Sequence, residues 1–205
     1  MDNASEIINR FQSLDTERLL LRRIRKSDAQ DMFEYAQLES VTRYLLWRPH
    51  PNVRYTSAYI GSLQRYYKNG SFFDYAVILK AEDKMIGTCG FAHLFTEHNS
   101  AEIGYVINPA YHDKGYATEA AGALVRFGFC NAGLNRIEAR YMIGNDASRR
   151  VMEKCGMIYE GTHVQSMYVK DKYVDIGVCA ITSDRYRAIF GSLPANAVLS
   201  KYPFC

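Results

Sequence analysis

The residues whose types and spacing best suit chemistry lie at positions 112–120, which read HDKGYATEA. Gly115 lets the backbone approach a ligand because it carries no Cβ, and Lys114 adds a positive charge. Small residues then lead into an apolar, helix-like run, and the free N–H groups at the start of a helix attract phosphate. The pattern therefore predicts a phosphate site at residues 113–118. The alternative, a plain helix cap with a glycine turn, is the more common meaning of so short a pattern.

Other motifs that carry chemistry are weak or absent from the sequence. It contains no G-x-x-x-x-G-K-[ST], no G-x-G-x-x-G, no G-x-S-x-G and no H-E-x-x-H, so nucleotide-loop, dinucleotide, hydrolase and zinc-protease functions lack support. Cys89, His93 and His98 come nearest to a metal-ligand set. Three loosely spaced residues of this kind are more often packed or solvated side chains, so we expect no metal.

Composition narrows the class of protein and of partner. Acidic and basic residues are mixed along the 205-residue chain, and the net charge of +3 lacks the basic stripe expected of a nucleic-acid-binding protein. No apolar run approaches the ~20 residues of a membrane span. The five cysteines are widely spaced without a C-x-x-C, which is typical of reduced thiols in the cytoplasm. We expect a cytoplasmic protein with no nucleic-acid or membrane partner.

Hydrophobic periodicity predicts one α/β domain over residues 1–182, followed by a tail at 183–205 that belongs to the same domain or to an interface, such as that of a homodimer. Ser27 and Gln30 form a capping-box pattern at one helix start, and Asn145 is a candidate cap at another. Gly87 and Gly90 indicate a bulge or a close backbone neighbour. Strands are expected at 17–24, 72–80, 85–95, 101–108, 136–143 and in a hairpin within 157–181, and helices at 27–38, 56–70, 117–131 and 145–156. The helix at 117–131 is suited to cross between two parallel strands.

The turn at 112–117, HDKGYA, resembles the fingerprint [QR]-x-x-G-x-[GA] of the GNAT superfamily of N-acetyltransferases, with His112 in place of Gln or Arg. The segments TERLLLRRIRKSDAQDMF, MIGTCGF, AEIGYVINPAYHDKGYATEA, NRIEARYMIGNDASRRVMEKCGMIYEG and YVKDKYVD occur in the order seen in the RimJ and RimL type, the ribosomal-protein N-acetyltransferase branch. Together they cover about residues 16–182. The resemblance implies an α/β GNAT fold: a single mixed, mostly antiparallel sheet with helices on both faces and a V-shaped splay between two central parallel strands.

The resemblance also implies acetyl-CoA as co-substrate. In this family the turn holds the pyrophosphate through backbone N–H groups, and the pantetheine arm lies in the splay between strands 101–108 and 136–143. The positive side chains of Lys114, Arg149, Arg150 and Lys154 could attract the ribose 3′-phosphate or be a solvated face. The implied cofactor-binding residues are Tyr105, Val106, Ile107, His112, Asp113, Lys114, Gly115, Tyr116, Ala117, Thr118, Asn145 and Ser148.

The implied reaction is acetyl transfer to an amine, which attacks as the neutral base. Glu102 is the first candidate for the base and Glu160 the second; the alternative for Glu102 is an exposed strand glutamate. Where many family members carry a tyrosine near the leaving sulfur this chain has Met152, and Ser148 can take that role. Asn145 and Ser148 could equally be plain helix-start residues.

The substrate region implied by the resemblance is the aromatic loop that contains Tyr44, Trp47 and His50, with Glu160 nearby. Packing of the first two helices is an equal explanation of the loop. Two acceptor classes stay open, a protein N-terminal α-amine and a small-molecule amine. The alternative from another class is a catalytically idle GNAT fold that binds acyl-CoA as a sensor or interaction module, which the loss of tyrosine at Met152 leaves open.

Overall fold

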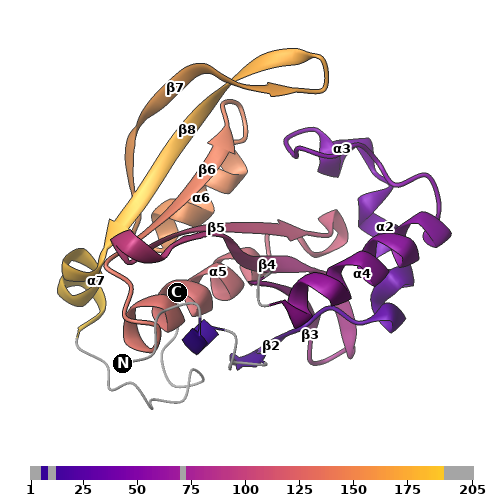
Figure 1. Ribbon diagram of the computed structural model, residues 1–205, viewed down its shortest axis with the longest axis horizontal. Coiled ribbons are helices and arrows are strands. Elements are labelled where there is room, and N and C mark those ends of the chain that lie inside the picture. The colour runs from indigo at the N-terminus through magenta and orange to yellow at the C-terminus, as the bar shows by residue number, and fades with distance from the viewer. Residues whose placement is uncertain (1–5, 9–12, 70–72, 192–205) are drawn as a thin grey trace.

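The computed structural model describes residues 6–8, 13–69 and 73–191, which form one mixed sheet with helices on both faces (Figure 1). The eight strands follow the order β1-β2-β3-β4-β5-β6-β8-β7. Strands β5 and β6 are parallel, and the other neighbouring pairs of described strands are antiparallel. The predicted α/β class and mixed, mostly antiparallel sheet are confirmed.

The strands are β1 (Ser13–Asp15), β2 (Leu19–Arg22), β3 (Phe73–Leu79), β4 (Lys84–Phe95), β5 (Ser100–Ile107), β6 (Arg136–Met142), β7 (Ile158–Val169) and β8 (Lys172–Thr182). The helices are α2 (Ala29–Ala36), α3 (Glu39–Thr42), α4 (Val53–Lys68), α5 (Tyr116–Cys130), α6 (Asp146–Lys154) and α7 (Ser183–Phe190). Short 3-10 turns lie at η1 (Lys26–Asp28), η2 (Thr96–His98) and η3 (Pro109–Tyr111). The elements α3 and β1 were not predicted, because each is too short to show a period, whereas α7 agrees with a tail that begins as a helix at residue 183.

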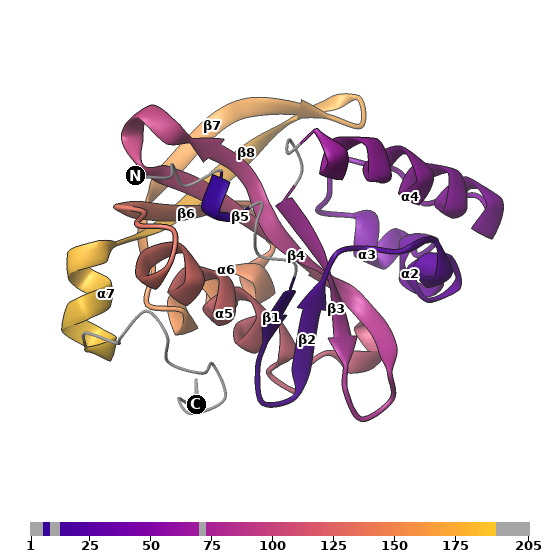
Figure 2. The ribbon, with the colours of Figure 1, turned by 60° about the horizontal axis from the view of Figure 1, so that its bottom comes forward.

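Alternation along the strands separates two cores, one on each face of the sheet. In β3, Tyr75 and Val77 belong to the core that contains α5, whereas Ala76 and Ile78 belong to the core that contains α2 and α4. Figure 2 shows α5, α6 and α7 on one side of the sheet and α2, α3 and α4 on the other. The second face is only partly covered, and the larger of the two cavities described below lies there, lined in part by α2 and α4.

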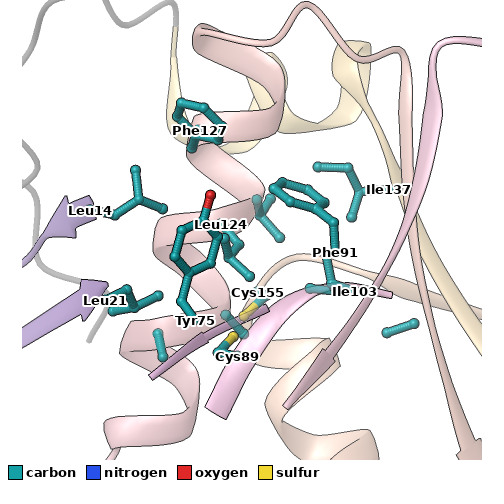
Figure 3. Packing of buried hydrophobic residues seen from close by; sticks show 14 of the residues in the cluster. Leu14, Leu21, Tyr75, Cys89, Phe91, Ile103, Leu124, Phe127, Ile137 and Cys155 are labelled. Carbon is teal, nitrogen blue, oxygen red and sulfur yellow. The ribbon is translucent and has the colours of Figure 1, made fainter. Parts of the chain in front are cut away.

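Helix α5 is the crossover between the parallel strands β5 and β6, as predicted. Its middle is buried over most of its circumference, because it lies across the sheet and also contacts α6. Leu124 and Phe127 lie in one cluster with Leu21, Phe91 and Ile137 from three different strands (Figure 3). This packing fixes the start of α5, and with it the preceding glycine turn, relative to the sheet.

Two helix starts differ from the prediction. Asp28, rather than Ser27 with Gln30, closes the box at the start of η1, where its carboxylate accepts a 2.7 Å hydrogen bond from Arg25 N. Helix α4 begins at Val53 instead of residue 56, because Asn52 caps it by accepting a hydrogen bond from Tyr55 N at 2.9 Å. In both places the capping side chain is a hydrogen-bond acceptor. Asp28 lies one residue from the predicted start, and Asn52 lies four residues from it.

The close approach predicted at Gly87 and Gly90 is confirmed. A Cβ on Gly87 would lie 2.1 Å from Val106 O, and one on Gly90 would lie 2.3 Å from Asp74 Cα. Beyond β8, α7 places Tyr186 in the core, with its ring centroid 5.0 Å from that of Phe129. Gly70 and residues 192–205 of the expected tail lie outside the described residues. No helix in the described part of the chain is long and apolar enough to cross a membrane.

Candidate active site

The parallel strands β5 and β6 separate before they end. Their register pairs Ser100 with Arg136 and continues to Ile103 opposite Ala139, but β5 runs on to Ile107 without a partner in β6. Figure 1 shows the two strands diverging from this point. The backbone of Gly104, Tyr105 and Val106 on the β6 side is therefore left for another partner.

The predicted phosphate turn follows β5 and η3 and ends at the start of α5. Asp113 and Gly115 have φ of 59° and 79°, so the chain reverses sharply through two left-handed residues. Gly115 is the residue before the first turn of α5, and no side chain caps that helix. The first N–H groups of α5 therefore point out of the helix start without a side-chain acceptor, an arrangement that attracts anions.

Arg18 and Glu119 hold this turn against the edge of the sheet. The Glu119 carboxylate accepts hydrogen bonds from Thr16 Oγ1 at 2.6 Å, Arg18 N at 2.9 Å and Arg18 Nε at 2.6 Å. Arg18 Nη1 donates to Lys114 O at 2.9 Å, and its guanidinium lies 4.6 Å from the centroid of the Tyr116 ring. No local sequence pattern indicates this clamp, because its two halves are about a hundred positions apart in the chain.

A cavity of about 470 Å³ joins the splay to the turn. Arg150 and Lys154 of α6 also line it, whereas Arg149 is paired with Glu153 at 2.8 Å outside it. Lys114 does not line the cavity; its carbonyl bonds to Arg18 and its ammonium lies over the Tyr111 ring. The other predicted cofactor residues all line it: Tyr105, Val106, Ile107, His112, Asp113, Gly115, Tyr116, Ala117, Thr118, Asn145 and Ser148.

A second cavity, of about 780 Å³, adjoins the first and extends toward α2 and α4. Much of its wall is aromatic, and it includes the predicted Tyr44 and Trp47. His50 fixes this wall: its Nδ1 lies 2.9 Å from Thr56 Oγ1, and its ring centroid is 5.2 Å from that of Trp47. The two cavities share the residues Tyr44, Leu45, Tyr105, Val106, Asn145 and Ser148.

At this junction a hydroxyl pair faces both cavities. Tyr105 Oη donates to Ser148 O at 2.7 Å and lies 3.0 Å from Ser148 Oγ. Burial raises the pKa of Tyr105 above its usual value, so the phenol stays protonated. Asn145 Oδ1 accepts from Ser148 N at 3.3 Å, so it also caps α6. Met152 and Tyr105 both line the larger cavity.

The two predicted bases lie away from both cavities. Glu102 is on the same face of β5 as Gly104, but its carboxylate is 3.4 Å from Arg140, and of the two only Arg140 lines a cavity. Burial is the main cause that raises the pKa of Glu102, and Arg140 opposes it. Glu160 on β7 is held by Arg136 at 2.8 Å, and this hydrogen bond lowers the pKa of Glu160. Neither carboxylate that the sequence suggested as a base lines the two cavities.

Asp74 is the carboxylate that lines the larger cavity, and it was not among the predicted site residues. Its Oδ1 accepts from Tyr75 N at 3.0 Å, and the Thr88 hydroxyl also hydrogen-bonds the side chain. Burial raises the pKa of Asp74 from 3.8 to about 7 despite these bonds. The available signal was an aspartate in the apolar strand FDYAVIL, on the face that it shares with Ala76 and Ile78.

Among residues 6–8, 13–69 and 73–191, no group of His, Cys, Asp and Glu could hold a metal ion. Cys89 is buried in the core, whereas His93 and His98 are exposed near the far end of β4. The cavities thus offer N–H groups, hydroxyls, aromatic rings and one carboxyl group, that of Asp74, whose pKa is raised.

Comparison with known proteins agrees with this geometry. Residues 18–158 match the acetyltransferase (GNAT) domain model. The N-acetyltransferase YoaA of Bacillus subtilis (strain 168) is 33% identical over 175 residues, which span 85% of this chain and 99% of that protein. A GNAT-family acetyltransferase from Bacillus anthracis has a TM-score of 0.75 at 33% identity, covering 84% of this chain and 99% of the other.

A relative of described activity is more distant. The [ribosomal protein uS5]-alanine N-acetyltransferase of Escherichia coli (strain K12) is 25% identical, over 83% of this chain and 90% of that protein. The domain match covers well over half of the chain, and the similarity to YoaA extends over nearly its whole described length. The chain therefore belongs to the GNAT family of acetyltransferases and is an N-acetyltransferase.

Proposed function

We propose that the chain transfers the acetyl group of acetyl-CoA to a primary amine by direct attack in a ternary complex. The observation that carries this proposal is the meeting of the two cavities at Tyr105 and Ser148. One cavity has the turn and the splay that suit a phosphorylated, extended cofactor, and the other has room for an acceptor. A thioester at the junction would be open to an amine from the other side.

The cofactor is proposed to lie along the smaller cavity. The N–H groups of about residues 113–118 bind its pyrophosphate, and the backbone of Tyr105 to Ile107 pairs with the pantetheine amides where β6 has diverged. Arg150 and Lys154 supply positive charge for the ribose 3′-phosphate. Acetyl-CoA is the common co-substrate of the family, and these residues fit its anionic and extended parts.

The chemical step follows from the groups at the junction. The amine nitrogen attacks the thioester carbon, and backbone N–H groups of β5 stabilise the oxyanion that forms. The Ser148 hydroxyl, oriented by Tyr105, then donates toward the departing sulfur. The thiolate has a pKa near ~8.5, so this donation contributes modestly near neutral pH. Glu102 could accept the proton of the amine only through intervening water, because Arg140 lies between its carboxylate and the cavity.

The acceptor is proposed to be either a protein N-terminal α-amine or a small-molecule amine. The uS5-alanine enzyme illustrates the first class among the relatives. We place the reaction in the cytoplasm, which fits the free thiols of Cys89, Cys130, Cys155 and Cys179. The tail after residue 182 is proposed to begin within the same domain, because Tyr186 packs in its core.

The test is release of free thiol from acetyl-CoA by the full chain, with a panel that contains primary amines and peptides with free N-termini. We expect amine-dependent thiol release, and a fall in kcat with an unchanged Kd for acetyl-CoA in Ser148→Ala. Tight acetyl-CoA binding with no turnover on any amine would contradict the proposal and favour an idle acyl-CoA-binding module.

A further inference from the structure

Three neighbouring strands place a carboxylate and two glycines in one row across the open face of the sheet. Asp74 of β3 is opposite Gly90 of β4, and Gly90 is opposite Gly104 of β5. A Cβ on Gly90 would lie 2.7 Å from Asp74 Oδ1, whereas one on Gly104 would meet nothing within 4 Å. All three residues line the larger cavity. Because Gly90 and Gly104 carry no side chains, this row places no side chain on the floor of the cavity between the splay and the Asp74 carboxylate.

The surroundings of Asp74 are suited to a cation. No cationic side chain has an ion pair with Asp74 among the described residues, and the wall of the cavity is rich in aromatic rings from α4 and the 44–51 loop. An ammonium ion is attracted by a carboxylate and by the faces of tyrosine and tryptophan. The cavity therefore has the chemistry of an ammonium site that the protein itself does not fill.

A second observation at the same cavity points to a ligand. The Tyr35 side chain is only 2% exposed, and its hydroxyl is buried without a hydrogen-bond partner in the described structure. Tyr35 lines the cavity together with Asp74. A buried hydroxyl without a partner is unfavourable, and an incoming donor or acceptor can satisfy it.

We propose that Asp74 and Tyr35 receive the acceptor as an ammonium ion and that Asp74 removes its proton before attack, so that the site selects a primary amine with an apolar skeleton. This inference rests on the proposed function, and it names the base and the substrate class of that site. Asp74 lies two strands from Gly104, or about 10 Å between backbones, since neighbouring strands are about 4.8 Å apart. The Asp74 carboxylate reaches over Gly90, where its Oδ1 lies 2.7 Å from the position of a Cβ, so about one strand spacing remains for the substrate nitrogen between the carboxylate and the thioester.

The proton balance of the step is closed. The ammonium ion gives one proton to the Asp74 carboxylate and becomes the neutral amine. Its lone pair forms the C–N bond to the thioester carbon, the C–S bond breaks, and the sulfur leaves with its electron pair. The second proton passes from the new amide nitrogen to the thiolate, which yields free CoA. Asp74 then releases its proton to solvent.

The titration behaviour around Asp74 fits this role. Its pKa of about 7 matches the task of accepting a proton near neutral pH. Tyr35 of α2 and Tyr59 of α4 line the same cavity, and Cys89 of β4 is buried on the opposite face of the sheet; burial raises the pKa of each, so they remain neutral. Tyr75 on the same strand also has its pKa raised, to about 12. The pKa of Tyr67, whose hydroxyl donates to Asp74 O, is raised as well.

Two groups on other walls of the cavity must be separated from Asp74 by experiment. His50 has its pKa lowered by burial, so it titrates below the usual histidine range. Arg140 carries a constant positive charge and is paired with Glu138 at 2.9 Å and Glu102 at 3.4 Å. Loss of an activity limb near pH 7 in Asp74→Asn would assign that limb to Asp74 rather than to His50.

The probe is 2-phenylethylamine, with 2-phenylethanol as its neutral counterpart. Calorimetry on the full chain saturated with CoA measures binding of each, and acetylation of the amine is followed against pH. We expect the ammonium to bind at least tenfold more tightly than the alcohol, and Asp74→Asn to abolish this preference. We also expect Asp74→Asn to lower kcat/KM at pH 7 by about a hundredfold and to remove the acidic limb, as for loss of a general base.

Tyr35→Phe supplies a separate readout. Because the hydroxyl has no partner among the described residues, we expect the variant to keep or gain thermal stability, while KM for the amine rises severalfold and the acidic limb stays. Asp184→Asn, on exposed α7, is the matched control and leaves all these values unchanged. If Asp74→Asn does not fold, Thr88→Val is used. It removes a hydrogen bond that lowers the pKa of Asp74, so the limb moves to higher pH.

Each outcome bears on the inference. A wild type that binds acetyl-CoA but neither binds nor acetylates 2-phenylethylamine overturns it, and leaves the proposed function to a peptide acceptor. An acidic limb that survives Asp74→Asn and disappears in Glu102→Gln also overturns it, in favour of Glu102. Failure of the wild type to bind acetyl-CoA at all would instead refute the proposed function.

Discussion

Glu119 is the residue through which the edge of the sheet fixes the phosphate turn, so replacing it with alanine is an informative change. Its carboxylate accepts three hydrogen bonds from Thr16 and Arg18, and Arg18 in turn bonds the carbonyl of Lys114 within the turn. Alanine is a good helix former, so Glu119→Ala removes these bonds without a penalty to α5. We expect lower stability together with weaker cofactor binding.

The magnitude follows from exposure. Hydrogen bonds to charged groups contribute about 1.5–3 kcal/mol each when shielded, but Arg18 is 43% exposed, which brings its ion pair toward the ~0–1 kcal/mol of surface pairs. Thr16 keeps a second acceptor, Leu19 O, at 3.0 Å. We expect a loss of about 2 kcal/mol, which lowers Tm by about 4–8 °C in a chain of this length. A turn less well held by about 1 kcal/mol raises the Kd for acetyl-CoA about fivefold.

The assay is thermal and urea unfolding with and without acetyl-CoA, with Glu153→Ala as the control. Glu153 pairs with Arg149 on the exposed face of α6, where both side chains are more than 40% exposed. Such a pair contributes little, so the control is expected to change neither Tm nor Kd measurably. If Glu119→Ala were no more destabilising than Glu153→Ala, or if it lost stability with no change in Kd, the reasoning about the clamp would be refuted.

Three further changes test the junction and the cavity floor. Tyr105→Phe removes the hydrogen bonds to Ser148, so we expect the free energy of unfolding measured with urea to fall by about 1 kcal/mol and kcat to be lower. Unchanged kinetics would exclude a part for this pair in the reaction. Gly104→Ala projects a methyl group into open space on the cavity floor, so the KM for the amine should rise while Tm and the Kd for acetyl-CoA stay the same. Gly61→Ala is the control, because a Cβ there also meets open space but lies on α4. Stability also depends on pH through Asp74: its folded pKa of about 7 exceeds its unfolded value of 3.8, so the folded chain binds the extra proton and wild-type stability falls as pH rises from about 4 to 7. Asp74→Asn should not show this fall. If Tm plotted against pH ran parallel for the wild type and Asp74→Asn, the raised pKa of Asp74 would be contradicted.

Local patterns predicted most of the fold. The alternating strands, the crossover helix α5 and the Asn145 cap all depend on short-range periodicity and capping, and each lies within a few residues of its expected place. The exact starts of η1 and α4 were missed because several residues near each start can cap, and tertiary packing decides among them.

The site was predicted less completely, because its key relations are long-range. The turn and splay residues follow one another in the chain, so a short motif could indicate them. Asp74 reaches the cavity only through its register with Gly90 and Gly104, which no local pattern contains. Glu160 fits a family position in the sequence, yet its pairing with Arg136 directs it elsewhere.

The central claim is that the turn at residues 113–118 binds the pyrophosphate of acetyl-CoA. The most direct measurement is a thermal-shift titration of the full chain with acetyl-CoA, with CoA, NAD and ATP in parallel. A ligand at a hundred times its Kd stabilises the fold by about 2.7 kcal/mol. We predict this shift for acetyl-CoA and CoA and a much smaller one for NAD and ATP. No shift at millimolar acetyl-CoA would contradict the claim and leave the turn as a helix cap alone.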